Sequence, residues 1–180
     1  MNVLGITGWS GSGKTFLITR LIPLLVARGL RVATIKHAHH DFDVDLPGKD
    51  SFEHRAAGAS EVIVASARRV AQIQELRGAP EPGLIDLLQR VSPCDLVLVE
   101  GFKRETHPKL EVFRRGNDRP PLHPTDESIV AVASDEDLPD SRIRRVHLDD
   151  IAAIADLVIA QARPVAEVRQ RLEAHGAAQR

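Results

Sequence analysis

The sequence predicts an α/β fold with an open, mostly parallel sheet, helices on both faces and an inserted β meander. Two patterns carry this prediction. Short, continuously apolar runs recur along the chain, as in strands that are buried on both faces of a parallel sheet. Between them, longer segments space apolar residues three and four positions apart, which is typical of helices packed on one side. The 180 residues suit one substantial core, so we expect a single domain over residues 1–180.

A strand-helix-strand unit is predicted at the N-terminus. Asn2–Thr7 has the composition of a short buried strand, and residues 15–28 have helical spacing, with Gly29 suited to the end of that helix. A second buried strand over residues 31–36 completes the unit, and this order implies a right-handed parallel crossover. The polar segment 37–49, rich in His and Asp, is predicted to be a loop over the site.

The insertion, a meander or a hairpin, is predicted after the second strand. A short helix over residues 50–57 is expected, with Asp50 as its N-cap and Glu53 three residues later. Strands over residues 61–66 and 69–76 are expected to pair in antiparallel fashion. The remaining predictions are a helix over 84–90, strands over 95–100, 109–114, 129–134 and 144–148, a loop over 116–127, and helices from Asp149 or Asp150 to 160 and from Pro164 to about 174.

The most specific motif follows the first strand. Eight consecutive residues match G-x-x-x-x-G-K-[ST], the loop that cradles phosphates in P-loop nucleoside triphosphate-binding proteins. Lys14 can reach the β- and γ-phosphates, and the Thr15 hydroxyl can ligate Mg²⁺. The alternative is a Gly/Ser turn that binds nothing. Such a turn does not require the observed order of strand, loop and helix, whereas a P-loop does, because this order points the helix N-terminus at the phosphates. The residues predicted to bind the nucleotide are Gly8, Trp9, Ser10, Gly11, Ser12, Gly13, Lys14, Thr15 and Phe16.

A P-loop also requires a carboxylate near the metal ion. Glu100 ends the strand predicted over 95–100, and ligands bind outside the carboxyl ends of parallel strands, so Glu100 is preferred over Asp95, about 16 Å away. The alternative for Glu100 is a strand-end side chain that simply meets water. Asp50 is a second candidate, for holding Mg²⁺ through water or for positioning the attacking water, and this role is compatible with capping. The candidate catalytic residues are therefore Lys14, Asp50 and Glu100, and the candidate metal ligands are Thr15, Glu100 and Asp50.

Composition and charge narrow the function classes. A net charge of -1 gives no global basic field, so we expect no nucleic-acid partner. The single cysteine excludes an internal disulfide, no charged-then-apolar leader precedes the first strand, and no apolar run approaches the length of a membrane span. We therefore expect a cytoplasmic protein that does not enter the membrane.

Two local features have more than one interpretation. Residues 103–119 carry six basic residues against three acidic ones, which suits either a solvated face or a groove for a phosphorylated ligand or acidic partner. The loop over residues 37–45 contains imidazole and carboxylate groups that suit a transition metal, yet its spacing fits no fixed metal motif, and histidines near phosphates are equally natural.

Several motifs together resemble the MobB family, the adaptor proteins of molybdopterin-guanine dinucleotide biosynthesis. The resemblance runs in order from residue 1 to residue 134. It rests on N-V-L-G-I-T-G-W-S-G-S-G-K-T at the start, I-K-H-A-H-H-D-F (35–42), D-L-P-G-K-D-S (45–51), A-A-G-A (56–59), L-V-E-G-F-K (98–103) and P-K-L-E-V-F-R (108–114).

The resemblance implies a GTP-binding homodimer with weak Mg²⁺-dependent GTPase activity. Its implied partners are the nucleotidyltransferase that attaches GMP to molybdopterin and a molybdopterin-related ligand. The chain lacks the N-K-x-D signature by which many GTPases recognise guanine, so the choice of base rests on the resemblance alone. It also lacks the early loop lysine of some dimeric relatives, since Trp9 and Ser10 stand there.

Two functions compete for this pattern. The first is a GTP-dependent adaptor, in which binding and slow hydrolysis change the loops around Asp50 and Glu100. The second is a small-molecule kinase, in which Asp50 is the base toward an acceptor hydroxyl and the lid arginines come from Arg114, Arg115 and Arg119. An ATP-driven nucleic-acid motor is disfavoured by the size and charge of the chain.

Overall fold

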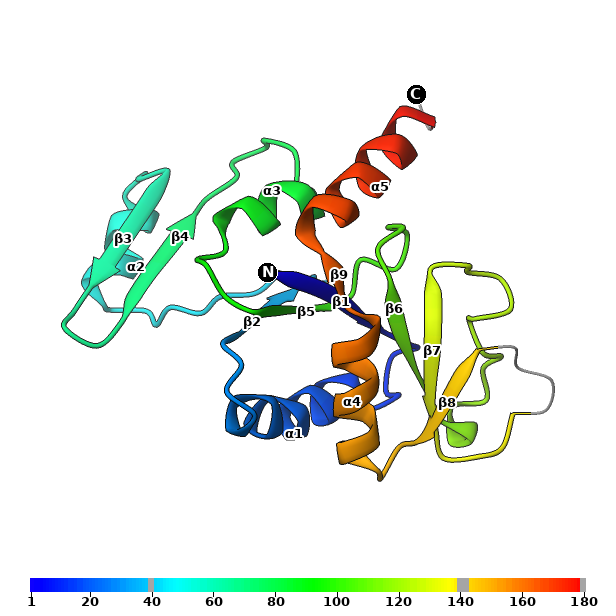
Figure 1. The fold of residues 1–180 in the computed structure, drawn as a ribbon. Helices are drawn as coiled ribbons and strands as arrows, with labels where there is room; N and C mark the ends of the chain where they lie inside the picture. Colours follow the sequence, from blue (N-terminus) through cyan, green and yellow to red (C-terminus); the bar gives the residue numbers. More distant parts are fainter. Residues whose placement is uncertain (39–40, 139–142, 179–180) are drawn as a thin grey trace. The chain divides into compact units, whose positions relative to one another are not determined.

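The chain divides into two compact units in a computed structural model that describes residues 1–38, 41–138 and 143–178. The first unit comprises residues 1–37 and 84–180, and the second comprises residues 38–83 (Figure 1). The second unit is therefore an insertion between two elements of the first.

The first unit is built on a seven-stranded sheet, and the prediction of a mostly parallel sheet is confirmed. All neighbours along the main path are parallel, and only the short β9 pairs antiparallel, with the start of β1. The order along the main path is β2 (Val32–Lys36), β5 (Leu96–Glu100), β1 (Asn2–Thr7), β6 (Lys109–Phe113), β7 (Ile129–Ser134) and β8 (Arg144–His147), with β9 at Arg163–Pro164.

Helices cover both faces of this sheet, as predicted. On one face α1 (Lys14–Ala27) and α4 (Ile151–Gln161) pack against Leu4 and Ile6 of β1. On the other face α3 (Leu84–Arg90) and α5 (Val165–Ala178) enclose Val3 (Figure 1). Successive side chains of β1 point to opposite faces of the sheet, so Leu4 and Ile6 belong to one apolar layer and Val3 belongs to the other. Within the part of the chain that the structure describes, no helix is both long and apolar enough to cross a membrane.

The helix boundaries resolve or correct several predictions. Gly29, at φ 85°, follows the last turn of α1 as predicted. Of the two candidate caps for α4, Asp150 is the N-cap, and its Oδ1 accepts the Ala153 N–H at 2.9 Å. Pro164 was expected in the first turn of the last helix, but it belongs to β9, because it extends the chain alongside Asn2 before α5 begins.

Strand β6 confirms the strand predicted over 109–114 to within one residue. It lies between β1 and β7 and is buried throughout. Its two charged residues are compensated inside the protein. The Lys109 ammonium donates to Asp126 at 3.1 Å and also to Ser128 and the Glu105 carbonyl, and Glu111 accepts the Leu122 N–H at 2.6 Å. A solvated face is therefore wrong for this part of the basic stretch.

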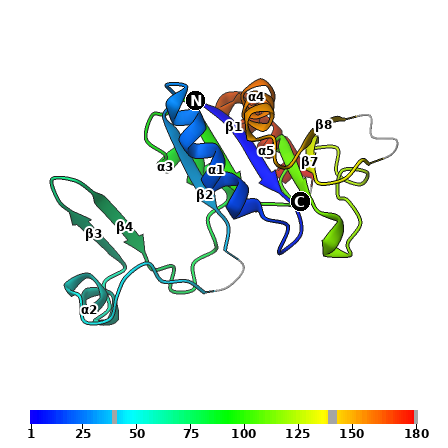
Figure 2. The same cartoon turned by 90° about the horizontal axis from the view of Figure 1, so that it is seen from below.

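The second unit contains α2 (Asp50–Ala56) and the antiparallel pair of β3 (Glu61–Ala65) and β4 (Val70–Gln74), as predicted (Figure 2). The predicted cap is wrong by one position. Lys49 is the N-cap, in an extended conformation, and its carbonyl accepts the Glu53 N–H, so Asp50 is already helical. The short helix η1 (Arg115–Asn117) of the first unit completes the elements.

Candidate functional site

The P-loop joins β1 to the N-terminus of α1, in the order that its chemistry requires. Gly8 adopts φ 141°, and a Cβ placed there would lie 2.4 Å from the Val112 carbonyl oxygen on β6. Only glycine therefore lets the loop pass this close to the neighbouring strand. Gly13 precedes α1 in a left-handed conformation, so the first N–H groups of the helix are left without side-chain capping.

Lys14 folds back over its own loop. Its ammonium donates to the carbonyl oxygens of Trp9 at 2.8 Å and Gly8 at 3.1 Å. Burial and the nearby Lys103 lower the pKa of Lys14, and Glu100 opposes this shift. The ammonium thus stands among other cations, an environment that favours an arriving anion.

Thr15 and Glu100 meet beside this lysine. The Thr15 hydroxyl donates to Glu100 Oε1 at 3.0 Å, and the Glu100 side chain is 13% exposed. The structure thus brings together three predicted site residues: Lys14, Thr15 and Glu100. Asp95 lies at the opposite end of β5, where it accepts the Arg31 N–H at 2.8 Å, so strand direction separates the two acids as expected.

Lys36 is a member of this cluster that the sequence analysis missed. It ends β2, pairs in register with Glu100, and its ammonium lies 3.5 Å from Glu100 Oε1. The signal was present in the sequence, because Lys36 also closes a predicted parallel strand and the carboxyl ends of such strands share one edge of the sheet.

Glu100 is followed by a tight turn. Gly101 has φ 96°, and a Cβ there would lie 2.8 Å from the His37 Cβ. The chain can therefore leave β5 close to the end of β2 only with glycine at this position.

Three members of the basic stretch converge on the P-loop. Lys103 Nζ and Arg119 Cζ lie 5.0 and 5.4 Å from the centre of the Trp9 ring, within the range of cation–π attraction. The Trp9 indole donates to the Pro120 carbonyl at 2.7 Å, and Arg114 Nε donates to the Ser12 carbonyl at 3.1 Å. These contacts place positive charge beside the loop, as an anionic ligand there would require.

The oxygen atoms at the start of α1 fit a magnesium ion. Thr15 and Glu100 offer a hydroxyl and a carboxylate within 3.0 Å of each other, and Mg²⁺ prefers such hard oxygen ligands. Asp50 is exposed and belongs to the second unit, so its predicted metal role stays a prediction. Among the described residues no three His, Cys, Asp or Glu side chains form a metal cluster, and His39 and His40 lie outside those residues.

The family of the chain follows from comparison with known proteins. The profile described as "MobB: Molybdopterin guanine dinucleotide synthesis protein B" matches residues 3–135. The chain belongs to the MobB family. A MobB relative from Escherichia coli (strain K12), named molybdopterin-guanine dinucleotide biosynthesis adapter protein, is 46% identical over 160 residues, covering 87% of this chain and 91% of the relative. A relative of the same name from Haemophilus influenzae is 45% identical, covering 87% and 86%.

Solved MobB structures share the fold. The crystal structure of a molybdopterin-guanine biosynthesis protein B (MobB) superposes with a TM-score of 0.69 at 30% identity, covering 88% of this chain and 98% of that one. A MobB homologue from Bacillus stearothermophilus gives a TM-score of 0.66 at 27% identity, covering 95% and 100%. The resemblance noted in the sequence is therefore confirmed over most of the chain.

Proposed function

We propose that this MobB-family chain is an adapter in molybdopterin-guanine dinucleotide biosynthesis that binds GTP with Mg²⁺ in its P-loop and hydrolyses it slowly. The observation that carries the proposal is the convergence of Lys14, Thr15 and Glu100 at the N-terminus of α1. The names of the two relatives supply the pathway, and the guanine base comes from the family resemblance.

The phosphates are expected to bind where backbone N–H groups and the positive end of α1 already point. Lys14 would exchange its two carbonyl partners for phosphate oxygens, and Lys36 and Lys103 add positive potential around it. Thr15 and Glu100 would hold the Mg²⁺, which neutralises phosphate charge when bound. Glu100 would then pair with the metal instead of accepting the Thr15 hydroxyl.

The arginines favour slow hydrolysis and the adapter role. Rapid phosphoryl transfer needs an arginine that is free to reach the transferring phosphate. Arg114 instead donates to the Ser12 carbonyl and lies 3.7 Å from Asp135, and Arg115 lies 3.3 Å from Glu136. Two of the three lid candidates of the kinase alternative are thus engaged with the protein itself.

The second unit supports a role in protein contacts. Of the ten large apolar side chains that are exposed among the described residues, seven lie within residues 38–83. Such a concentration is typical of surfaces that bind other proteins. We include the nucleotidyltransferase, a molybdopterin-related ligand and a second copy of the chain among the proposed partners. The seven side chains are Phe42, Val44, Leu46, Ile63, Val64, Val70 and Leu76.

Nucleotide titrations test the site. Trp9 is the only tryptophan and lies within the loop, so its fluorescence should report GTP binding. We expect Lys14→Ala to abolish this change. Glu100→Gln should lower Mg²⁺-dependent phosphate release by about tenfold or more while weakening binding less. Asp95→Asn, at the other end of the same strand, is the matched control and should leave both unchanged.

Two results would contradict the proposal. Wild-type affinity for GTP in the Lys14 variant would remove the P-loop from the function. Rapid transfer of the γ-phosphate to a small acceptor would replace the adapter role by a kinase. The pathway assignment is tested by adding the chain to a nucleotidyltransferase with molybdopterin and GTP, where we expect faster formation of the dinucleotide.

A further inference from the structure

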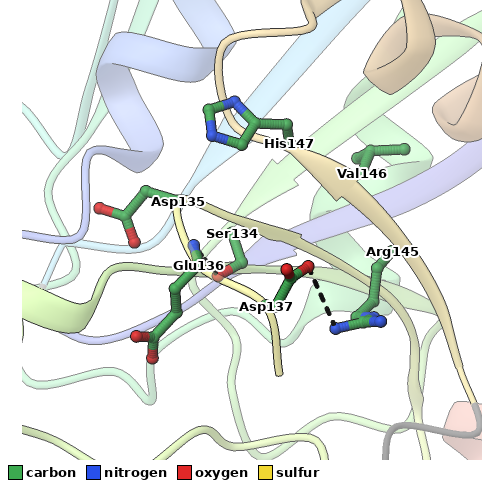
Figure 3. A pocket seen from close by; sticks show the side chains of 7 residues that line it. All are labelled: Ser134, Asp135, Glu136, Asp137, Arg145, Val146 and His147. Atoms are coloured by element: carbon green, nitrogen blue, oxygen red, sulfur yellow. Dashed lines mark hydrogen bonds and ion pairs between the residues drawn. The ribbon is translucent and has the colours of Figure 1, made fainter. Parts of the chain in front are cut away.

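A pocket of about 450 Å³ opens at the carboxyl ends of β7 and β8. This volume is in the range of small-molecule sites. β7 and β8 run parallel to β6, which is parallel to β1, so the pocket opens at the same edge of the sheet as the P-loop. Figure 3 shows its lining, which is Ser134, Asp135, Glu136, Asp137, Arg145, Val146 and His147.

Asp135 is the lining carboxylate whose position is fixed. Its Oδ1 accepts the Arg115 N–H at 3.1 Å, and its side chain is 34% exposed. Its Oδ2 lies 3.7 Å from Arg114. Because a carboxylate has about four acceptor positions, these two contacts leave Asp135 able to accept further N–H donors. Asp137, in contrast, is fully exposed, and within the described part of the chain its ion-pair partner is Arg145 at a distance of 3.9 Å (Figure 3).

The pocket also offers a hydrogen-bond donor. The Asp149 N–H donates to His147 Nδ1 at 3.2 Å, which places the proton of the neutral imidazole on Nε2. His147 can therefore donate to a carbonyl oxygen, whereas the Val146 side chain packs against the apolar layer that contains Leu148 and Ile154. The lining thus supplies an acceptor for N–H groups in Asp135 and a donor for a C=O group in His147.

We propose that this pocket binds a 2-amino-4-oxopyrimidine edge, the edge that guanine and pterins share, with Asp135 accepting the ring N–H and the exocyclic amino group. Adenine has no ring N–H on its corresponding edge, so its ring nitrogen lone pair would face the carboxylate. The absence of N-K-x-D from the sequence is then no obstacle to guanine selectivity, because Asp135 supplies the same acceptor from another motif.

The base of a P-loop nucleotide is the occupant that the geometry favours, and this part rests on the proposed function. β7 is two strands from β1, or roughly 10 Å along the sheet edge. Arg114 connects the two sites, since it donates to the Ser12 carbonyl of the P-loop and lies 3.7 Å from Asp135 Oδ2. A nucleotide whose phosphates lie on the loop can thus extend its base along this edge toward Asp135.

Calorimetric titration of the full chain with GTP, ATP and xanthosine triphosphate tests the proposal. Wild type should prefer GTP over ATP by about tenfold or more, as expected for hydrogen bonds to a charged group. Asp135→Asn keeps an acceptor for the Arg115 N–H but presents an N–H to the ligand. It should therefore lower the affinity for GTP by about tenfold. It should raise the affinity for xanthosine triphosphate, which has a carbonyl in place of the amino group. Asp95→Asn, at the opposite edge of the sheet, is the control and should change neither affinity.

A second arm distinguishes the two sources of this edge. Free pterin is titrated into wild type and the Asp135 variant. If the variant no longer binds pterin but still binds GTP, the occupant is a pterin. If the variant no longer binds GTP and wild type does not bind pterin, the occupant is the nucleotide base. Unchanged affinity for both ligands overturns the proposal. An equal loss of GTP and ATP with a lowered melting temperature also overturns it, because Asp135 would then only support Arg114.

Failure of the P-loop proposal has a different signature. If wild type binds no triphosphate at all, the proposed nucleotide function is wrong, whereas pterin binding that depends on Asp135 would still establish the pocket. If wild type binds GTP and ATP equally through Lys14, the P-loop stands and the base-recognising pocket is wrong.

Discussion

His107 should make the stability of this protein fall steeply in mild acid. The ring is fully buried just before β6, against Gly5, and neither ring nitrogen has a hydrogen-bond partner among the described residues. Burial, with a contribution from the nearby Lys109, lowers the pKa of His107 from 6.5 to about 3, against the attraction of Asp126. The native protein therefore holds this imidazole neutral over a range in which an unfolded chain protonates it.

The size of the effect follows from proton linkage. Above pH 6.5 both states are neutral at this position and the stability is fully present; as the pH falls toward 3, only the unfolded state takes up the proton. Within this window each pH unit lowers the free energy of unfolding by about 1.4 kcal/mol, so the loss reaches about 2 kcal/mol at pH 5. A domain with a total stability of about 5–15 kcal/mol would lose a large fraction of it.

Urea unfolding followed by circular dichroism at pH 7.5, 6.0 and 5.0 measures this loss. His107→Leu removes the titrating group with little change in volume, so its free energy of unfolding should fall by about 2 kcal/mol less than that of wild type between pH 7.5 and 5.0. The same substitution at the exposed His54 should keep the wild-type dependence. If the free energy of unfolding falls with pH equally in wild type and in the His107 variant, the assignment of a neutral buried imidazole is refuted.

Two further predictions concern a helix cap and the added cation of the site. Asp150→Ala should lower the free energy of unfolding by about 1 kcal/mol in urea titrations, since it removes the bond to the Ala153 N–H, whereas Asp149→Ala should stay within about 0.5 kcal/mol. A larger effect at Asp149 would reverse the cap assignment. Lys36→Met should lower the affinity for GTP by about tenfold and reduce the salt dependence of binding, because a positive charge near the phosphates is lost. Equal GTP affinities in the Lys36 variant and the exposed control Lys49→Met would remove Lys36 from the site.

Local patterns were sufficient for most of the fold and for the centre of the site. The apolar runs of β1 and β5 and the helical spacing of α1 each lie within a few consecutive residues, and the P-loop is a contiguous motif. The direction of a parallel strand then predicted that Glu100, not Asp95, lies beside Thr15, as the 3.0 Å contact shows. A contiguous motif and the direction of one strand can be recognised without knowing which residues pack beside them in the fold.

Strand β6 shows where this kind of reasoning ends. The charges of Lys109 and Glu111 left a solvated face as one interpretation of the basic stretch, because charged side chains are costly to bury without partners. Their partners lie in a later loop: Asp126 for Lys109, and the Leu122 and His123 N–H groups for Glu111. That compensation exists only after β6 is placed between β1 and β7 and the loop folds over it.

The sequence by itself determined the phosphate-binding loop, the parallel α/β architecture and the family, since each is written in consecutive residues or in a regular period. Only the tertiary structure decided that Lys36 stands beside Glu100, that Arg114 joins the loop to Asp135, and that β7 and β8 end around one pocket. These arrangements depend on the order of strands across the sheet. Hydrophobic periodicity reports whether a residue is buried within its own element, but it carries no information about which element lies next to it.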